Sequence, residues 1–341
     1  MAGNSVFQVG VESQPGSAGV GVFSISTGPA HPSGSGRDVL YGSPAGEQPP
    51  TSYLTVRSYT TGTDYVQAAS ASSGNRVFPL DSFGAVTPIA GNGFETSYDL
   101  TAPGAAPEAL QIRAHIEVSG QDIEDSQVKL SAAVTNAGAF PVSIGFRYLL
   151  DFSLAGDDGP QLDIPGAGDT RLREETLTPA PSAAVITGNG PGGEEMSMTT
   201  RPVDGPAADS LAFASWPHAA PFAFDYTTAD RDIAGRCGLN DSALIYYFGS
   251  AETTAFQLDP GQTARVALAL SATQEPPQSQ VGPASCQTAP TPQPTGAPTP
   301  MPATASPAPS VSAGPQPSLP VVTPAALPRT GAQSAPLPRG R

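Results

Sequence analysis

Apolar and polar residues alternate strictly through the middle of the chain. Apolar side chains stand at every second position from Leu110 to Val118, and polar or small ones stand between them. The same alternation returns from Val128 to Val134. Successive side chains of a strand point to opposite faces of a sheet, so this pattern predicts two strands that each bury one face.

A third stretch with apolar residues at every second position, residues 142–150, follows shortly after the second. The tripeptide Asn-Ala-Gly at 136–138 stands between them, and Asn and Gly are favoured in tight turns. We therefore expect residues 128–134 and 142–150 to pair as one long β-hairpin.

Shorter strand patterns occur through the first 274 residues, whereas no amphipathic helix is evident. Turn signals separate them at Asn92-Gly93, at Asn189-Gly190 and in the Leu-Asp-Pro-Gly-Gln-Thr sequence at 258–263. About 14 to 18 strands are expected, which predicts an all-β fold: a large antiparallel two-sheet β-sandwich of a supersandwich-like kind. The further strand segments are 19–27, 52–66 (itself a hairpin), 182–188, 242–248 and 263–270.

The composition changes near residue 275. Residues 275–341 hold 18 of the 39 prolines and no aromatic residue. Such a segment cannot bury a hydrophobic core and favours extended polyproline-II conformations. We therefore expect a β-sandwich domain over 1–274 and a disordered stalk, rich in Pro, Ala, Thr and Ser, over 275–341.

The charge of the chain excludes some partners. The formal net charge is −15, and Lys129 is the only lysine. An acidic surface repels phosphate backbones and anionic lipid, so nucleic-acid and membrane-surface binding are not expected. No apolar run is long enough for a transmembrane segment, and the first residues lack the pattern of a signal peptide.

Near the end of the chain, Leu327, Pro328, Arg329, Thr330 and Gly331 spell the pattern LPxTG. This resembles the sorting signal of sortase substrates, which implies cleavage between Thr330 and Gly331 and transfer to peptidoglycan. The sequence that follows lacks the hydrophobic segment of a complete signal and ends with two arginines. The resemblance therefore indicates a sorting signal cut short, and with it an extracellular or cell-wall location.

Two cysteines, Cys237 and Cys286, are present. In an extracellular protein they could pair as one disulfide, and in a cytosolic protein they would be two free thiols. Two cysteines and three scattered histidines do not make a four-ligand zinc site.

The densest group of carboxylates follows residues 142–150 directly. It consists of Asp151, Asp157, Asp158 and Asp163. Clustered carboxylate oxygens are the ligands that Ca²⁺ prefers, although the spacing is not that of an EF-hand. The alternative is that these aspartates build turns.

A second candidate site contains the only tryptophan. Trp216 lies close in sequence to His218, Asp225 and Tyr226. Aromatic rings beside a carboxylate and an imidazole suit a glycan-binding face, while the alternative places the aromatic residues in the core. No nucleophile, metalloprotease or nucleotide-binding motif is present, so the sequence identifies no catalytic residue.

Several segments together resemble a group of uncharacterised bacterial secreted or surface β-sandwich proteins. The resemblance implies an extracellular β-sandwich, an architecture also used by galactose-mutarotase-like carbohydrate enzymes. We therefore expect a non-enzymatic surface protein, displayed on a stalk and anchored by sortase. The alternative is a carbohydrate-binding or carbohydrate-active module. The segments are 21–28, 38–44, 51–59, 132–159, 241–248 and 258–270.

Overall fold

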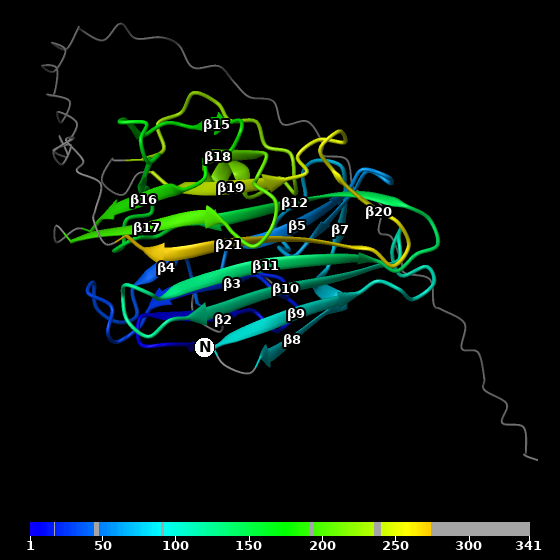
Figure 1. Ribbon diagram of the computed structural model, residues 1–341, viewed down its shortest axis with the longest axis horizontal. Helices are drawn as coiled ribbons and strands as arrows, with labels where there is room; N and C mark the ends of the chain where they lie inside the picture. Colours follow the sequence, from blue (N-terminus) through cyan, green and yellow to red (C-terminus); the bar gives the residue numbers. More distant parts are fainter. Residues whose placement is uncertain (17, 44–47, 90–91, 191–193, 235–239, 274–341) are drawn as a thin grey trace, which may run out of the picture. The chain divides into compact units, whose positions relative to one another are not determined.

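A computed structural model describes residues 1–16, 18–43, 48–89, 92–190, 194–234 and 240–273. Within these ranges the chain forms three β-sheets, one helical turn and one short 3-10 helix (Figure 1). The predicted all-β, predominantly antiparallel sandwich is confirmed. None of the described helices is long and apolar enough to cross a membrane.

The largest sheet has nine strands, all antiparallel to their neighbours, and Figure 1 shows it running from β8 at one edge through β10, β11 and β21 to β17 and β16. Burial alternates along β10 and β11, as their sequence pattern predicts. In sheet order the strands are β14 (Thr170–Arg171), β13 (Gln161–Asp163), β16 (Ala184–Asn189), β17 (Glu195–Pro202), β21 (Thr263–Ala272), β11 (Gln127–Asn136), β10 (Leu110–Ser119), β9 (Gly93–Asp99) and β8 (Gly84–Ile89).

The second sheet has eight strands and packs against the first. Only its β6–β7 pair is parallel. In sheet order its strands are β15 (Glu175–Leu177), β18 (Ser210–Ser215), β19 (Ser242–Phe248), β12 (Val142–Asp151), β5 (Tyr53–Ser58), β6 (Thr63–Val66) and β7 (Arg76–Pro79), with β20 (Phe256–Leu258) paired to β12.

A third, four-stranded sheet adds to the predicted two. It consists of β1 (Ala2–Gly3), β2 (Phe7–Val11), β3 (Phe23–Thr27) and β4 (Asp38–Leu40). Its apolar residues, Phe7 and Ile25 among them, belong to the same hydrophobic core as the two large sheets. The helices are the 3-10 helix η1 (Asp81–Phe83) and α1 (Trp216–Ala219).

The predicted hairpin between residues 128–134 and 142–150 is wrong. β11 pairs with β10 and β21 in the nine-stranded sheet, whereas β12 pairs with β5, β19 and β20 in the other. Both strands do bury the apolar face that the alternation predicts, but the two faces meet across the core rather than within one sheet. The connection between them is therefore an arch from one sheet to the other.

Asn136 fixes this arch to a second one. Its side-chain amide donates to the carbonyl oxygens of Phe140, at 2.8 Å, and Leu258, at 2.9 Å. Its side-chain oxygen accepts from the amide of Gly138. Leu258 begins the Pro-Gly turn, which joins β20 in one sheet to β21 in the other. One fully buried side chain thus ties together two crossings between the sheets.

The central strand β12 is buried at every position, because both faces of its sheet are covered. One face contributes to the main core with residues such as Phe146 and Tyr148. The opposite face contributes Leu149 to a second hydrophobic cluster, which also includes Ala219, Ala223 and Phe224. We call residues 216–234 the covering segment, because they close this outer face of the eight-stranded sheet.

The described residues end at Thr273. The predicted boundary near residue 275 and the predicted stalk over 275–341 therefore lie outside the described residues and stay predictions. Cys237, Cys286 and the LPxTG residues 327–331 lie outside them as well.

Candidate functional site

Strand register brings charged residues together under the covering segment. Arg57 on β5 pairs directly with Asp64 on β6 and with Gly145 on β12. Gly145 allows Gly249 and Phe224 to pack closely here, since a Cβ at this position would lie 2.3 Å from the Gly249 carbonyl oxygen and 3.2 Å from the ring of Phe224. Arg147, two positions further along β12, pairs with Tyr247 on β19.

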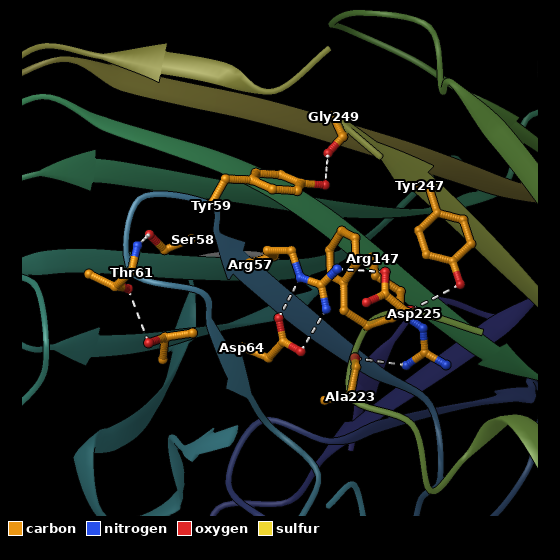
Figure 2. Close-up of polar contacts among 12 residues, drawn as sticks. Arg57, Ser58, Tyr59, Thr61, Asp64, Arg147, Ala223, Asp225, Tyr247 and Gly249 are labelled. Atoms are coloured by element: carbon orange, nitrogen blue, oxygen red, sulfur yellow. Dashed lines mark hydrogen bonds and ion pairs between the residues drawn. The ribbon is translucent and has the colours of Figure 1, made fainter. Parts of the chain in front are cut away.

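The guanidinium of Arg57 lies between two carboxylates, as Figure 2 shows. It binds Asp64 in a bidentate manner, with N–O distances of 2.7 and 2.9 Å, and its remaining nitrogen donates to Asp225 at 2.5 Å. Its carbon Cζ also lies 4.3 Å from the centre of the Phe224 ring. Burial by itself would lower the pKa of Arg57, but the hydrogen bonds to Asp64 and Asp225 raise it above its ordinary value.

Arg147 is fully buried on the same face and meets oxygens that carry no formal charge. Its guanidinium donates to the Tyr53 hydroxyl at 3.0 Å and to the carbonyl oxygens of Ala219 and Ala223, each at 3.2 Å. None of the ion pairs within the described ranges involves Arg147. Buried charge is tolerated when it is hydrogen-bonded, and two carbonyl groups of the covering segment supply part of these bonds, while Nε of Arg147 has no partner among the described residues.

Two tyrosines extend this contact between sheet and covering segment. The Tyr53 hydroxyl donates to the carbonyl oxygen of Ala220 at 2.9 Å, and the Tyr247 hydroxyl donates to that of Phe224 at 3.0 Å. Figure 2 shows Arg57, Arg147 and Tyr247 grouped around Ala223 and Asp225. The first half of the covering segment is thus held by its backbone, independently of most of its side chains.

The second half of the covering segment is fixed by one buried carboxylate, Glu174. Its oxygens accept from the Ser215 amide, the Tyr226 hydroxyl and the Ala229 amide, each at 2.7 Å. Arg231 donates to it at 2.9 Å. The Glu174 side chain is completely buried, so its charge depends on these four donors.

Two residues of the fixed segment, Phe222 and Asp225, are exposed, and the half-buried Tyr226 contacts Phe222. Phe222 is 36% exposed, and its ring packs edge-on against Tyr226 with ring centres 5.7 Å apart. The Asp225 side chain is 63% exposed although one of its oxygens binds Arg57. We call Phe222, Asp225 and Tyr226 the exposed patch. It combines an apolar ring with a carboxylate held in one position.

The residues proposed from sequence for glycan binding fall partly into this patch. Asp225 and Tyr226 belong to it. Trp216 instead packs, partly buried, against the second hydrophobic cluster, as the core alternative predicted. His218 is exposed on α1, where its ring lies 2.9 Å from the Ser215 hydroxyl. Tyr226 packs against the same cluster and is likewise only partly exposed, so the stacking role proposed for Trp216 stays a prediction.

Three of the four aspartates proposed for Ca²⁺, Asp151, Asp157 and Asp163, accept hydrogen bonds from the protein through their side chains. The Thr51 hydroxyl donates to Asp151, the amides of Gly159 and Asn189 donate to Asp157, and the Thr170 hydroxyl donates to Asp163. Within the described ranges no three His, Cys, Asp or Glu side chains are placed to hold a metal ion. The calcium site stays a prediction that this geometry does not favour.

The sequence alone did not single out Arg57, Asp64, Arg147, Glu174 or Phe222. Arg57 and Asp64 do carry a local signal, since they stand at directly opposed positions of the predicted hairpin over 52–66. The contact between Arg57 and Asp225 has no such local signal in the sequence, because the two residues are 168 positions apart.

No protein family matches the chain, and no curated protein resembles it in sequence. Among solved structures it is similar to a polysaccharide lyase, with 14% identity and a TM-score of 0.39 over 80% of this chain and 33% of that one. The chain thus spans about a third of the lyase.

Two smaller structures align over nearly their full length. A putative aldose 1-epimerase from Escherichia coli K12 shows 10% identity and a TM-score of 0.44 over 78% of this chain and 99% of that one. A galactose mutarotase-like protein from Lactobacillus casei shows 12% identity and a TM-score of 0.42 over 79% and 98%. One sandwich architecture hosts many unrelated functions, so the function has to be argued from the site.

Proposed function

We propose that this protein is an extracellular β-sandwich that binds carbohydrate, without catalysis, at the exposed patch of Phe222, Asp225 and Tyr226. The observation that carries the proposal is the fixed, exposed carboxylate of Asp225 in the segment that also carries the exposed Phe222. Sugar rings present apolar C–H faces and hydroxyl groups side by side, so a binding site needs an apolar surface next to well-placed polar groups.

The aromatic half of the patch offers the apolar surface. The Phe222 ring is 36% exposed, and its edge-on contact with Tyr226 orients it. Aromatic pairs of this geometry are favourable beyond simple area burial, so the orientation persists without a ligand. The C–H face of a sugar can therefore pack on Phe222 with little loss of side-chain entropy.

The polar half of the patch is the Asp225 carboxylate. An exposed aspartate normally samples several rotamers, and ordering it would weaken binding. Here Arg57 holds one oxygen at 2.5 Å while the side chain remains 63% exposed. The exposed part of this carboxylate is thus preorganised to accept hydrogen bonds from sugar hydroxyls.

A glycan array tests the proposal on the full chain. Wild type should bind a defined set of glycans, and Phe222→Ala and Asp225→Asn should each lose most of that signal. Phe140→Ala is the matched control, because Phe140 is 80% exposed on the arch between β11 and β12. No binding by wild type, or equal losses for Phe222→Ala and Phe140→Ala, would contradict the proposal.

A second proposal concerns how the protein is displayed. The Leu327–Gly331 sequence favours a sortase substrate that is joined to peptidoglycan, at least in an ancestral form of the protein. Purified sortase should release a fragment that ends at Thr330, and a Thr330→Ala variant should stay intact. Mass spectrometry that finds only intact wild-type chain after prolonged incubation would make the motif a chance match.

A further inference from the structure

The guanidinium of Arg57 is shared by two carboxylates, as Figure 2 shows. Asp64 accepts from two of its nitrogens, at 2.7 and 2.9 Å, and Asp225 accepts from the third at 2.5 Å. The Asp64 side chain is completely buried, whereas that of Asp225 is largely exposed. One positive charge thus meets two negative charges. The excess negative charge is open to a ligand at Asp225.

The other arginine that contacts the exposed patch does not balance this excess. Arg231 donates to the Tyr226 hydroxyl at 3.1 Å, but it also binds Glu174 at 2.9 Å. The Glu174 side chain is completely buried, and Arg231 is the ion-pair partner recorded for it within the described ranges. The positive charge of Arg231 is therefore matched by that carboxylate.

One oxygen of Asp225 stays available to a ligand. Arg57 binds Oδ1, and the other oxygen, Oδ2, has no hydrogen-bond partner among the described residues. A hydroxyl group can donate to Oδ2. An ammonium group gains more from this contact, because it supplies the missing positive charge together with the hydrogen bond.

Given the proposed function, on which this inference rests, we propose that the ligand is a glycan with a free amino group, such as a hexosamine without its acetyl group. The ammonium group binds Oδ2 of Asp225, and an apolar C–H face of the glycan packs on Phe222. Glycans with carboxylate or sulfate groups are repelled by the same excess charge, and the net charge of −15 acts in the same direction.

A glycan array that carries each hexosamine glycan in a free-amine and an N-acetylated form tests this on the full chain. At a pH at which the amine is protonated, the free-amine forms should bind about tenfold more tightly, because they add an ion pair. Glycans with acidic groups should not bind. Calorimetric titration with the glucosamine tetrasaccharide and its N-acetylated form then measures the ratio of the two Kd values in solution.

The protonation of the ligand gives a second test that needs no variant. When the pH is raised until the sugar amine loses its proton, the free-amine form should bind no more tightly than the acetylated form. The acetylated form, titrated at the same pH, corrects for any change in the protein. The advantage of the free amine should also shrink as salt rises, because the Asp225 side chain is largely exposed.

Two variants with the same change of charge assign the preference to one residue. Asp225→Asn should remove the preference for the free amine. Asp230→Asn is the matched control and should keep it, because Asp230 is an exposed aspartate of the covering segment that pairs with Arg173. Phe222→Ala should weaken both forms by the same factor, since it leaves the charge in place.

Trilysine, which offers ammonium groups without a sugar, separates glycan binding from general attraction to an acidic protein. It should bind at least about tenfold more weakly than the glucosamine tetrasaccharide, because it lacks the apolar face of a sugar ring. Equal affinity for the two would overturn the proposal.

The proposal also fails if wild type binds the free-amine and acetylated forms equally, or if Asp225→Asn keeps the preference. In both cases the proposed carbohydrate function stands, because a glycan still binds. Absence of any glycan binding by wild type would overturn both proposals, so the two failures are distinguishable.

Discussion

At the scale of single residues, Arg57 and Arg147 show two ways of burying a guanidinium on one sheet face. Arg57 is neutralised by Asp64 and by Asp225. Arg147 donates from its two terminal nitrogens to the Tyr53 hydroxyl and to main-chain carbonyls, while its Nε has no partner among the described residues. In both cases one partner lies on the sheet and another on the covering segment, so each arginine fixes that segment as it satisfies its own hydrogen bonds.

Breaking the Arg57–Asp64 pair should be strongly destabilising. Asp64→Asn leaves a buried guanidinium with only Asp225 as its charged partner, and removing one member of a buried pair costs about 3 kcal/mol or more. Urea unfolding measures this as a fall in the free energy of unfolding. Asp230→Asn is the control: it removes an exposed pair with Arg173 and should cost less than about 1 kcal/mol. Equal effects would show that burial of the pair is not decisive.

Asp241 makes stability depend on pH. Burial, with a contribution from the nearby Asp158, raises its pKa from 3.8 to about 7. Between these values the folded chain binds more protons at this site than the unfolded chain, so this contribution to stability is lost as pH rises through about 7. Burial also raises the pKa values of Asp38 and Asp151, with Asp158 again contributing, so they act in the same direction.

The comparison with Asp241→Asn separates this effect from that of distant groups such as His31. The substitution also removes the charge that helps to raise the pKa of the neighbouring Asp151. The melting temperature of Asp241→Asn minus that of wild type should rise from about pH 4 to about pH 7 and level off above, because within this range the folded wild type holds a proton that its unfolded chain has lost. Asp230→Asn, at an exposed position, should show a constant difference. A difference for Asp241→Asn that stays constant with pH would contradict the prediction.

At the scale of elements, the sequence located strands well and paired them less well. The hairpin over 52–66 and the strand at 242–248 are confirmed, whereas the hairpin expected around 136–138 is an arch between sheets. Alternation reports which face of a strand is buried. It does not report which strand lies beside it, since an apolar face is equally well buried by a neighbour across the core.

The arch depends on Asn136, which therefore offers a test at this scale. Asn136→Ala removes three side-chain hydrogen bonds and leaves the Leu258 carbonyl without that buried donor. The free energy of unfolding should fall by about 2 to 3 kcal/mol. Asn75→Ala, at an exposed position, should change it by less than about 0.5 kcal/mol. A small change for Asn136→Ala would mean that the two arches hold without it.

At the scale of the whole molecule, the stability of the protein should reside in the residues that build the sheets. Residues 288–341 contain no aromatic residue and three charged ones, all arginine, so they offer little apolar surface to bury. A chain that ends after Gln287 should therefore melt within about 1 °C of the full chain. Differential scanning calorimetry of both chains measures this, and a lower melting temperature for the shorter chain would assign the C-terminal residues a role in folding.

The candidate site could be predicted only in part. The sequence singled out Asp225 and Tyr226 because a carboxylate and aromatic residues stand close together. It left two alternatives open for Trp216, because sequence spacing does not tell an exposed ring from one packed against a second hydrophobic cluster. Arg57 was missed because its role depends on a contact across 168 positions.

The sequence by itself determined the all-β class and the buried face of most long strands, because these follow from local alternation and turn chemistry. The tertiary structure alone decided which strands distant in sequence pair, that a covering segment closes the second sheet, and that Asp225 is held on Arg57. Contacts between distant residues leave no local pattern, since they are selected by packing of the whole chain.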